Sequence, residues 1–364
     1  MTPKRLIASM VWPWNAHKTA PAELSAQEIP DLHGIDSLVA ALPDPVLILD
    51  AEGIIIRANS HAQAMLGAIN PGMHISHAIR APAVLEAISQ NIPTRVEYES
   101  RGPLPRSYEV YISPMAAASP EAAAMLLVVK DLTREQQIER MRSDFVANAS
   151  HELRTPLASL SGFIETLLGA AKADEKAREK FLNLMRGQAE RMKRLIDDLL
   201  SLSRIEMNAH LRPSGRVDMA QIAQHVGDSL APMAREEKVE LKFELPAPLN
   251  VEGDHDELVQ VVLNLVENAI KYSGPDKTVR IGGDVEPGFV SLSVIDQGPG
   301  IAPEHIPRLT ERFYRISVQE SRSRGGTGLG LAIVKHILNR HRGKLTVTSE
   351  PGQGSVFKIR LPSI

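Results

Sequence analysis

The spacing of hydrophobic residues changes twice along the chain and divides it into three regions. From about residue 35 to residue 131 the apolar runs are short and strand-like. From Thr133 to about residue 210 apolar residues recur at intervals of three and four, which is typical of helices buried along one stripe. Beyond residue 210 strand-like and helical patterns alternate again. The pattern predicts a multidomain α+β chain, and residues 1–34 are expected to form a flexible N-terminal segment.

The first region is expected to form a small α/β domain over residues 35–131. A hairpin is predicted where Ala51-Glu52-Gly53 separates two strand-like runs, and Asn59 is predicted to cap a short helix. The expected strands are Val46–Asp50, Ile54–Ala58, Tyr108–Ile112 and Met125–Val129. This layout resembles a PAS sensor domain.

The second region, residues 132–210, is predicted to form two long helices joined by a short polar turn near residues 169–174. The first apolar stripe consists of Ile138, Met141, Phe145, Leu153, Leu157, Leu160, Ile164 and Leu167. The second consists of Phe181, Met185, Gln188, Met192, Leu195, Leu199 and Leu202. Because no intervening sequence covers these stripes, we expect two hairpins to pair as a four-helix bundle in a homodimer. A monomeric hairpin is the alternative, and it would leave the stripe half exposed.

Residues 211–364 are expected to form an α/β sandwich, with helices stacked on one face of a sheet. Predicted helices cover residues 218–236 and 254–272, and another follows Leu329. The predicted strands are Val239–Phe243, Val279–Ile281, Val290–Val294, Leu345–Ser349 and Ser355–Ile359.

Candidate chemistry begins with the segment Ser150–Leu157, which places a histidine, an adjoining carboxylate and a hydroxyl on the first long helix. His151 and Thr155 are four residues apart and therefore share one helix face. Pro156 lacks a backbone donor, and we expect it to bend the helix beside the histidine. An exposed imidazole next to the carboxylate of Glu152 is a candidate nucleophile toward phosphorus. By itself the segment also fits an ordinary surface histidine.

A polar stripe interrupts the apolar helix predicted at residues 254–272. Its members are Asn264, Glu267, Asn268 and Lys271, which lie three or four residues apart. Buried amides need partners, and oxygen ligands for Mg²⁺ together with a lysine for phosphate would supply them. For this motif alone, a solvated helix face is an equal alternative.

Glycine-rich segments follow in the same region. Asp296–Gly300 comes directly after a strand, where an acid can accept from the amine of adenine and glycines leave room for the base; ordinary turn chemistry is the alternative. Gly325–Leu331 opens a helix, and backbone amides at such a start form an anion site. The arginine-rich stretch at residues 317–324 is expected to be a mobile lid. Gly352–Ser355 is expected to shape a turn between the final strands.

Composition excludes several classes of protein. The net charge of −3 argues against a general nucleic-acid binder. The absence of cysteine excludes disulfide scaffolds and thiolate sites and agrees with a reducing compartment. No run approaches the roughly 18 apolar residues that span a bilayer. A cytoplasmic protein is therefore expected, with inner-membrane association if an N-terminal anchor is missing or a partner supplies one.

Each motif is modest alone, but their order is specific. The chain resembles the bacterial sensor histidine kinases of two-component systems, strongly over about residues 131–364 and weakly over the PAS-like part. More narrowly, Asp144–His151 and Arg308–Arg315 resemble segments of phosphate-regulon sensor kinases. The resemblance implies a Bergerat (GHKL-like) ATP-binding fold and an ATP-dependent protein-histidine kinase that acts in phosphate-starvation signalling. Such sensors usually carry transmembrane helices, and none is predicted here.

The resemblance also implies roles for individual residues. His151 would be the phosphoacceptor, Glu152 the base that orients it, and Thr155 the residue that positions water when the partner is dephosphorylated. Mg²⁺ would be held by Asn264, Glu267 and Asn268. ATP would be bound by Asn264, Asn268, Lys271, Tyr272, Asp296, Gly298, Gly300, Arg315, Gly326, Gly328 and Gly330. The implied partners are an OmpR/PhoB-like response regulator, a second copy of the chain and membrane-associated phosphate-sensing proteins, with no direct contact to nucleic acid.

Two other classes of protein remain open at this point. Chaperone and mismatch-repair ATPases share the Bergerat fold, but they do not need an exposed histidine on a dimeric hairpin. A scaffold that binds a regulator without catalysis would not need the complete set of nucleotide motifs. A eukaryotic-type serine/threonine kinase is excluded, because neither its catalytic loop nor its Mg²⁺-binding motif is present.

Overall fold

The structure is a computed structural model that describes residues 32–67, 69–100, 105–115, 124–169, 171–172, 174–208, 210–246, 248–317 and 326–364. The chain divides into two compact units, Met1–Arg140 and Met141–Ile364. The flexible segment expected at residues 1–34 and the lid expected at residues 317–324 lie almost entirely outside the described residues.

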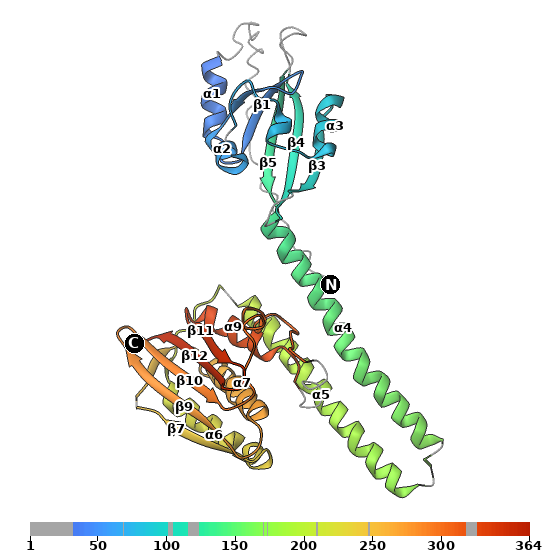
Figure 1. The fold of residues 1–364 in the computed structure, drawn as a ribbon, viewed down its shortest axis with the longest axis vertical. Helices are drawn as coiled ribbons and strands as arrows, with labels where there is room; N and C mark the ends of the chain where they lie inside the picture. Colours follow the sequence, from blue (N-terminus) through green and yellow to red (C-terminus); the bar gives the residue numbers. More distant parts are fainter. Residues whose placement is uncertain are drawn as a thin grey trace, which may run out of the picture. The chain divides into compact units, whose positions relative to one another are not determined.

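The first unit is built on a five-stranded antiparallel sheet with the strand order β2-β1-β5-β4-β3 (Figure 1). Its elements are α1 (Leu32–Ala41), β1 (Val46–Asp50), β2 (Ile55–Ala58), α2 (Ser60–Leu66), η1 (Ile75–His77), α3 (Pro82–Gln90), β3 (Thr94–Glu99), β4 (Ser107–Met115), β5 (Ala124–Asp131) and the start of α4 (Thr133–Leu168). The strands and the helix expected from the sequence are confirmed, whereas α1, α3 and β3 were not predicted.

Alternation along β1 gives this sheet two apolar faces. Leu47 and Leu49 lie in the core that α2 and α3 cover, whereas Val46 and Ile48 pack with Val39 of α1. Asn59 caps α2, as predicted, and its side chain also links α2 to β1 and to the end of α1. Its Oδ1 accepts from the backbone amides of Ala62 and Val46 (2.9 and 3.1 Å), and its Nδ2 donates to three carbonyls at the end of α1 and just beyond it.

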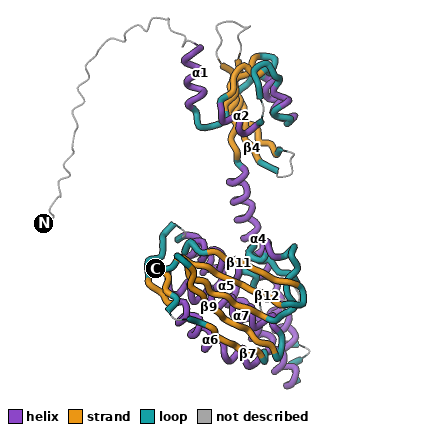
Figure 2. Tube along the Cα trace, turned by 60° about the vertical axis from the view of Figure 1, so that its left-hand side comes forward, coloured by secondary structure: helices purple, strands orange, loops and turns teal. Residues whose placement is uncertain are grey.

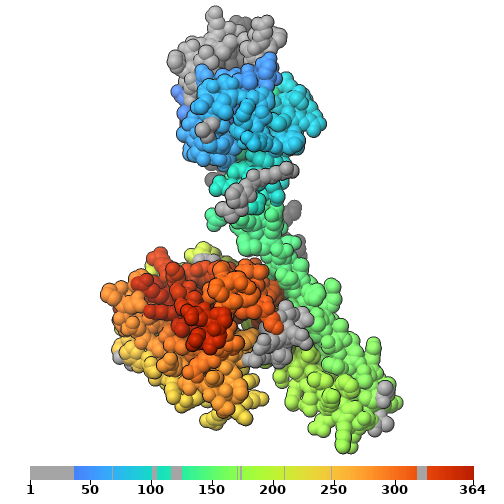
Figure 3. Space-filling view, viewed as in Figure 1, coloured from blue at the N-terminus to red at the C-terminus, as the bar shows by residue number. Residues whose placement is uncertain are grey.

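The second unit begins with an antiparallel helical hairpin formed by α4 and α5 (Glu175–Met207), whose helices lie side by side in the space-filling view (Figure 3). The turn falls where the sequence predicted it, and α4 continues through Pro156. The tilted rings of Phe163 and Phe181, with centroids 5.6 Å apart, pack together and hold the helices in contact. Within the single chain several members of the first stripe stay exposed, namely Ile138, Met141, Leu157 and Ile164.

The rest of the second unit is a sheet with the order β11-β12-β10-β9-β7, in which β7 runs parallel to β9 and the other pairs are antiparallel. Helix α7 packs on β9 and β10, α6 on β7 and α9 on β11, so the helices share one face of the sheet (Figure 2). This confirms the predicted α/β sandwich. The elements are β6 (Arg216–Asp218), α6 (Met219–Glu236), β7 (Val239–Glu244), β8 (Asn250–Glu252), α7 (His255–Ser273), β9 (Lys277–Glu286), β10 (Phe289–Asp296), η3 (Ile306–Arg308), α9 (Gly330–Arg340), β11 (Lys344–Glu350) and β12 (Gly354–Pro362).

Within the described part of the chain, no helix is both long enough and apolar enough to cross a membrane.

Candidate nucleotide and phosphoacceptor site

A cavity of about 430 Å³ opens between α7, the start of α9, the segment after β10 and one face of α5. Most of the residues that the sequence assigned to a nucleotide or to Mg²⁺ line it. These are Asn264, Glu267, Asn268, Lys271, Tyr272, Asp296, Gly300, Arg315, Gly326, Gly328 and Gly330. Gly298 is not among the lining residues; its backbone amide instead donates to Asp296 Oδ1 at 2.9 Å.

Helix α7 carries the polar stripe into this cavity. Asp254 caps its N-terminus by accepting from two backbone amides, and its other face is buried against the sheet, so the orientation of the stripe is fixed. Asn264 is only 8% exposed, and its Nδ2 donates to Gly330 O at 3.4 Å, which ties α7 to the start of α9. Lys271 forms an ion pair with Glu267 one turn earlier (2.6 Å).

Asp296 ends β10 at the floor of the cavity and is almost completely buried. Burial raises its pKa above the ordinary 3.8, and hydrogen bonds from Gly298 and Ser355 offset part of that rise. The side chains of Ile301, Leu309 and Phe357 line the same cavity. A buried acceptor among apolar walls suits a flat base that presents an amine.

Two of the glycines are required by the packing of the chain on itself. Gly300 has a φ of +72°, and a Cβ there would collide with the backbone of Glu350. Gly328 has a φ of +77°, and a Cβ there would lie 2.9 Å from the Cα of Phe313. The glycines therefore shape the rim of the cavity through contacts between protein segments.

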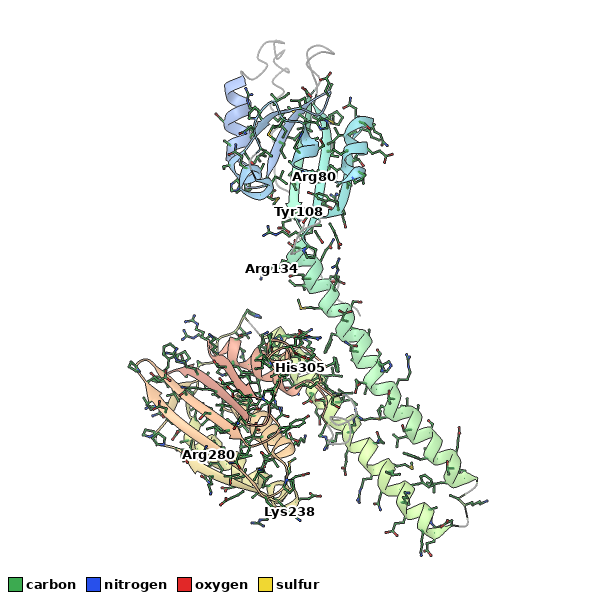
Figure 4. The ribbon with its side chains drawn as sticks, viewed as in Figure 1. Arg80, Tyr108, Arg134, Lys238, Arg280 and His305 are labelled. Atoms are coloured by element: carbon green, nitrogen blue, oxygen red, sulfur yellow. The ribbon has the colours of Figure 1, made fainter. Side chains whose placement is uncertain are left out.

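Tyr314 is held at the cavity from two sides. His305, labelled in Figure 4, hydrogen-bonds through Nδ1 to the Tyr314 hydroxyl at 2.7 Å. The guanidinium carbon of Arg308 lies 4.3 Å from the centre of the Tyr314 ring. Tyr314 thus presents a fixed aromatic side chain beside Arg315.

Arg315 connects the cavity to the hairpin. Its side chain is 4% exposed, and its Nη2 donates to Thr327 O at 2.6 Å and to Glu152 Oε2 at 3.1 Å. The same oxygen of Glu152 accepts from Arg191 Nη2 at 3.0 Å. The carboxylate beside His151 therefore contacts a residue that lines the cavity.

His151 itself is exposed on α4, as the chemistry proposed for it requires. Thr155, one turn later, is also exposed, and its hydroxyl donates to the His151 carbonyl at 3.2 Å. Such a bond leaves the hydroxyl oxygen near the histidine on the shared face.

Three residues of α5 that the sequence did not indicate also line the cavity: Arg194, Asp197 and Asp198. Asp198 Oδ2 accepts from the Thr327 hydroxyl at 2.7 Å, and burial raises the pKa of Asp198. These three residues are spaced by three and four, so they share one face of α5 beside the apolar stripe. That spacing could have indicated a site, but it is equally typical of charged residues that face solvent.

Further contacts join the hairpin to the sheet domain near the C-terminal end of α5. The rings of Phe145 and Phe313 lie 5.9 Å apart, and the Arg312 guanidinium lies 5.0 Å from the Phe145 ring centre. Arg312 also forms an ion pair with Glu206 of α5, and His336 Nε2 lies 3.6 Å from the same carboxylate. One aromatic pair and one shared carboxylate thus fasten this edge of the interface.

The donors in the cavity fit Mg²⁺ bound together with phosphates. Asn264, Glu267 and Asn268 bring amide and carboxylate oxygens to one wall, and Mg²⁺ takes a few protein oxygens and completes its shell with water and phosphate. Among the described residues there is no group of three or more His, Cys, Asp or Glu side chains placed to hold a metal ion.

Comparison with protein-family models agrees with this arrangement. Residues 253–364 match the model described as histidine kinase-, DNA gyrase B-, and HSP90-like ATPase, and residues 141–208 match the His Kinase A (phospho-acceptor) domain. Residues 35–95 match the PAS domain.

Individual relatives point the same way. The chain is 36% identical over 326 residues to the phosphate regulon sensor protein PhoR of Pseudomonas aeruginosa, covering 89% of this chain and 73% of that protein. It is 31% identical over 338 residues to the sensor protein kinase WalK of Staphylococcus saprophyticus, covering 90% of this chain but 55% of that protein. The solved structure of histidine kinase ThkA in complex with response regulator protein TrrA is similar in fold, with a TM-score of 0.50, 20% identity, and coverage of 90% of this chain and 98% of that one.

Proposed function

The chain belongs to the sensor histidine kinases of two-component systems, and from this premise we propose that it transfers the γ-phosphoryl group of ATP to His151. The observation that carries the assignment is the bond between Arg315 and Glu152. It connects a cavity with nucleotide chemistry to the carboxylate adjoining an exposed histidine. An exposed histidine without such a connection would be an ordinary surface residue.

The proposed step forms one bond and breaks one. The Nε2 lone pair of His151 attacks the γ-phosphorus, and the bond from that phosphorus to the β,γ-bridging oxygen breaks, so ADP leaves with the electron pair. Positive charge develops on the imidazole, and the Glu152 carboxylate accepts the Nδ1 proton or holds it by a hydrogen bond. Most of the rate enhancement would come from positioning and from neutralising the phosphate charge with Lys271 and Arg315.

The nucleotide would lie with adenine against Asp296 and its phosphates toward the Gly326–Gly330 segment. Asn264, Glu267 and Asn268 would hold Mg²⁺, which would neutralise phosphate charge while ATP is bound. The ion pair of Lys271 with Glu267 would loosen as the phosphates attract the lysine.

The roles of the three regions follow from this chemistry. Residues 35–131 would form the sensor, residues 132–210 the dimerisation and phosphotransfer hairpin, and residues 211–364 the catalytic domain. The exposed members of the α4 stripe support burial in a four-helix homodimer. Phosphohistidine would then pass the group to an aspartate of an OmpR/PhoB-like response regulator, and Thr155 would position water for the reverse dephosphorylation.

Phosphate-starvation signalling is the biological role that we favour. It is supported by 36% identity to a PhoR protein over most of the chain, and by coverage of 73% of that protein. Similar identity to WalK sensor kinases makes the response regulators of those kinases the competing partners. Phosphotransfer from the labelled chain to purified regulators of both kinds would distinguish them by relative rate.

The activity itself is tested by incubating the purified chain with γ-labelled ATP and Mg²⁺. A protein-bound label that is lost in acid and survives alkali is the expected result for phosphohistidine. ATP hydrolysis without any labelled protein would instead favour the conformational ATPases that share this fold.

A further inference from the structure

Arg191 of α5 is bound to Glu152 across the hairpin. Its Nη2 donates to Glu152 Oε2 at 3.0 Å, and the two side chains are only 14% and 13% exposed. The residues lie 39 positions apart in the sequence. Charge-assisted hydrogen bonds of this length are strong, and partial burial reduces screening by solvent.

Two arginines therefore share one oxygen of this carboxylate, but their surroundings differ. Arg315 lines the nucleotide cavity, so a bound triphosphate would offer it a competing anion. Arg191 is not among the residues that line the cavity, and it belongs to the same hairpin as Glu152. If Arg315 turned to the phosphates, Arg191 could keep its contact with Glu152.

We propose that Arg191 is a positioning residue for phosphorylation of His151, one that acts through Glu152. This inference rests on the proposed function. Arg191 holds the carboxylate in one orientation, so that Glu152 remains a hydrogen-bond acceptor for the imidazole as charge develops on the ring. Arg315 shares the carboxylate only until nucleotide binds.

Holding the hairpin together would be a simpler role for Arg191, but other contacts already do so. The rings of Phe163 and Phe181 pack against each other near the turn, and Leu195 and Leu202 are buried farther along α5. The bond to Glu152 also lies beside the phosphoacceptor, where orientation matters most.

The test compares Arg191→Met, which removes the charge and keeps an unbranched side chain, with Arg191→Lys, which keeps the charge. Rates of His151 labelling are measured against ATP concentration, with circular dichroism to confirm folding. We expect Arg191→Met to lower kcat by about tenfold or more and to leave the KM for ATP within about twofold. Arg191→Lys should recover part of the loss. Arg186→Met, an exposed arginine on the same helix, is the matched control and should match the wild type.

A double-variant comparison separates action through Glu152 from a general effect on the hairpin. In a Glu152→Gln background the Arg191→Met change should cause little further loss, because its effect passes through the carboxylate already removed. If the double variant lost the product of the two single-variant losses in kcat, the proposal would be overturned. An Arg191→Met protein with the wild-type kcat would also overturn it. If Arg191→Met does not fold, Arg191→Gln, which also removes the charge, takes its place, and an unchanged kcat in that variant would overturn the proposal. Absence of labelling in the wild type would reject the proposed function itself.

Discussion

Arg315 Nη2 lies 3.1 Å from Glu152 Oε2, although the two residues are 163 positions apart in the sequence. One lines a cavity suited to a nucleotide, and the other adjoins the exposed imidazole of His151. In the proposed function this contact links the nucleotide cavity of the α/β sandwich to the histidine of the helical hairpin.

Asp296 provides a prediction about pH. Its pKa is raised in the folded protein, so above the ordinary value of 3.8 the folded state holds more protons than the unfolded state, and the free energy of unfolding falls as pH rises through the folded pKa. Asp296→Asn removes the buried charge. Without nucleotide, the variant should be more stable than the wild type at about pH 7, with a smaller difference at about pH 4, in urea titrations.

The same variant should lose the stabilisation that ATP gives the wild type, since the carboxylate acceptor for the adenine amine is gone. Asp284→Asn, an exposed change on β9, is the control and should alter neither quantity. An Asp296→Asn protein that is less stable than the wild type without nucleotide would contradict the stated cause of the pKa shift.

The metal prediction concerns Asn264. Mg²⁺ should strengthen ATP binding to the wild type, and Asn264→Ala should lose most of that gain, by about tenfold or more in affinity. The gain in ATP affinity is measured by calorimetric titration with ATP, in the presence of Mg²⁺ and again with a chelator. Asn183→Ala on the exposed side of α5 should keep the full effect of Mg²⁺, and an equal Mg²⁺ effect in both variants would remove Asn264 from the metal site.

Thr155→Ala should reduce dephosphorylation of the regulator more than it reduces labelling of His151, because water positioning is needed only in the hydrolytic direction. The two rates are measured on the same preparation. Thr166→Ala is a close control, since the Thr166 hydroxyl makes the same type of bond to a carbonyl four residues earlier on α4 (2.8 Å). Equal loss of both activities in Thr155→Ala would exclude a separate hydrolytic role.

Phe145→Ala should loosen the contact between the hairpin and the sheet domain. Loss of the ring pair with Phe313 removes about 1 kcal/mol beyond simple burial, and Arg312 loses its aromatic neighbour. Hydrogen exchange should accelerate in α9 and at the end of α5, with ATP affinity unchanged. Val146→Ala, at the next and 59% exposed position, should leave exchange as in the wild type; unchanged exchange in Phe145→Ala would mean that this contact does not hold the domains together.

The sequence predicts the long elements closely, because periodicity and caps act locally. The helix expected at residues 254–272 is observed at His255–Ser273 with Asp254 as its cap. Strand β3 (Thr94–Glu99) was missed although its charged residues alternate with Thr94, Val96 and Tyr98, as is typical of a half-buried strand. Strands β6 and β8 are too short to show any period.

The residues of α7 and of the glycine-rich segments that line the cavity could also be predicted to lie together, since their motifs are local. Arg191 and Asp198 could not, because their partners Glu152 and Thr327 are brought to them by packing of distant segments. Charged residues on an exposed helix face look the same in sequence whether or not another domain docks there.

The most direct measurement is labelling of His151→Ala by γ-labelled ATP, beside wild type and His210→Ala, which changes an exposed histidine just beyond α5. ATP binding is measured for all three proteins. Wild type and His210→Ala should carry acid-labile label, whereas His151→Ala should bind ATP normally and carry none. Retained label on His151→Ala would show that phosphate is transferred elsewhere and would contradict the assignment of His151 as the phosphoacceptor.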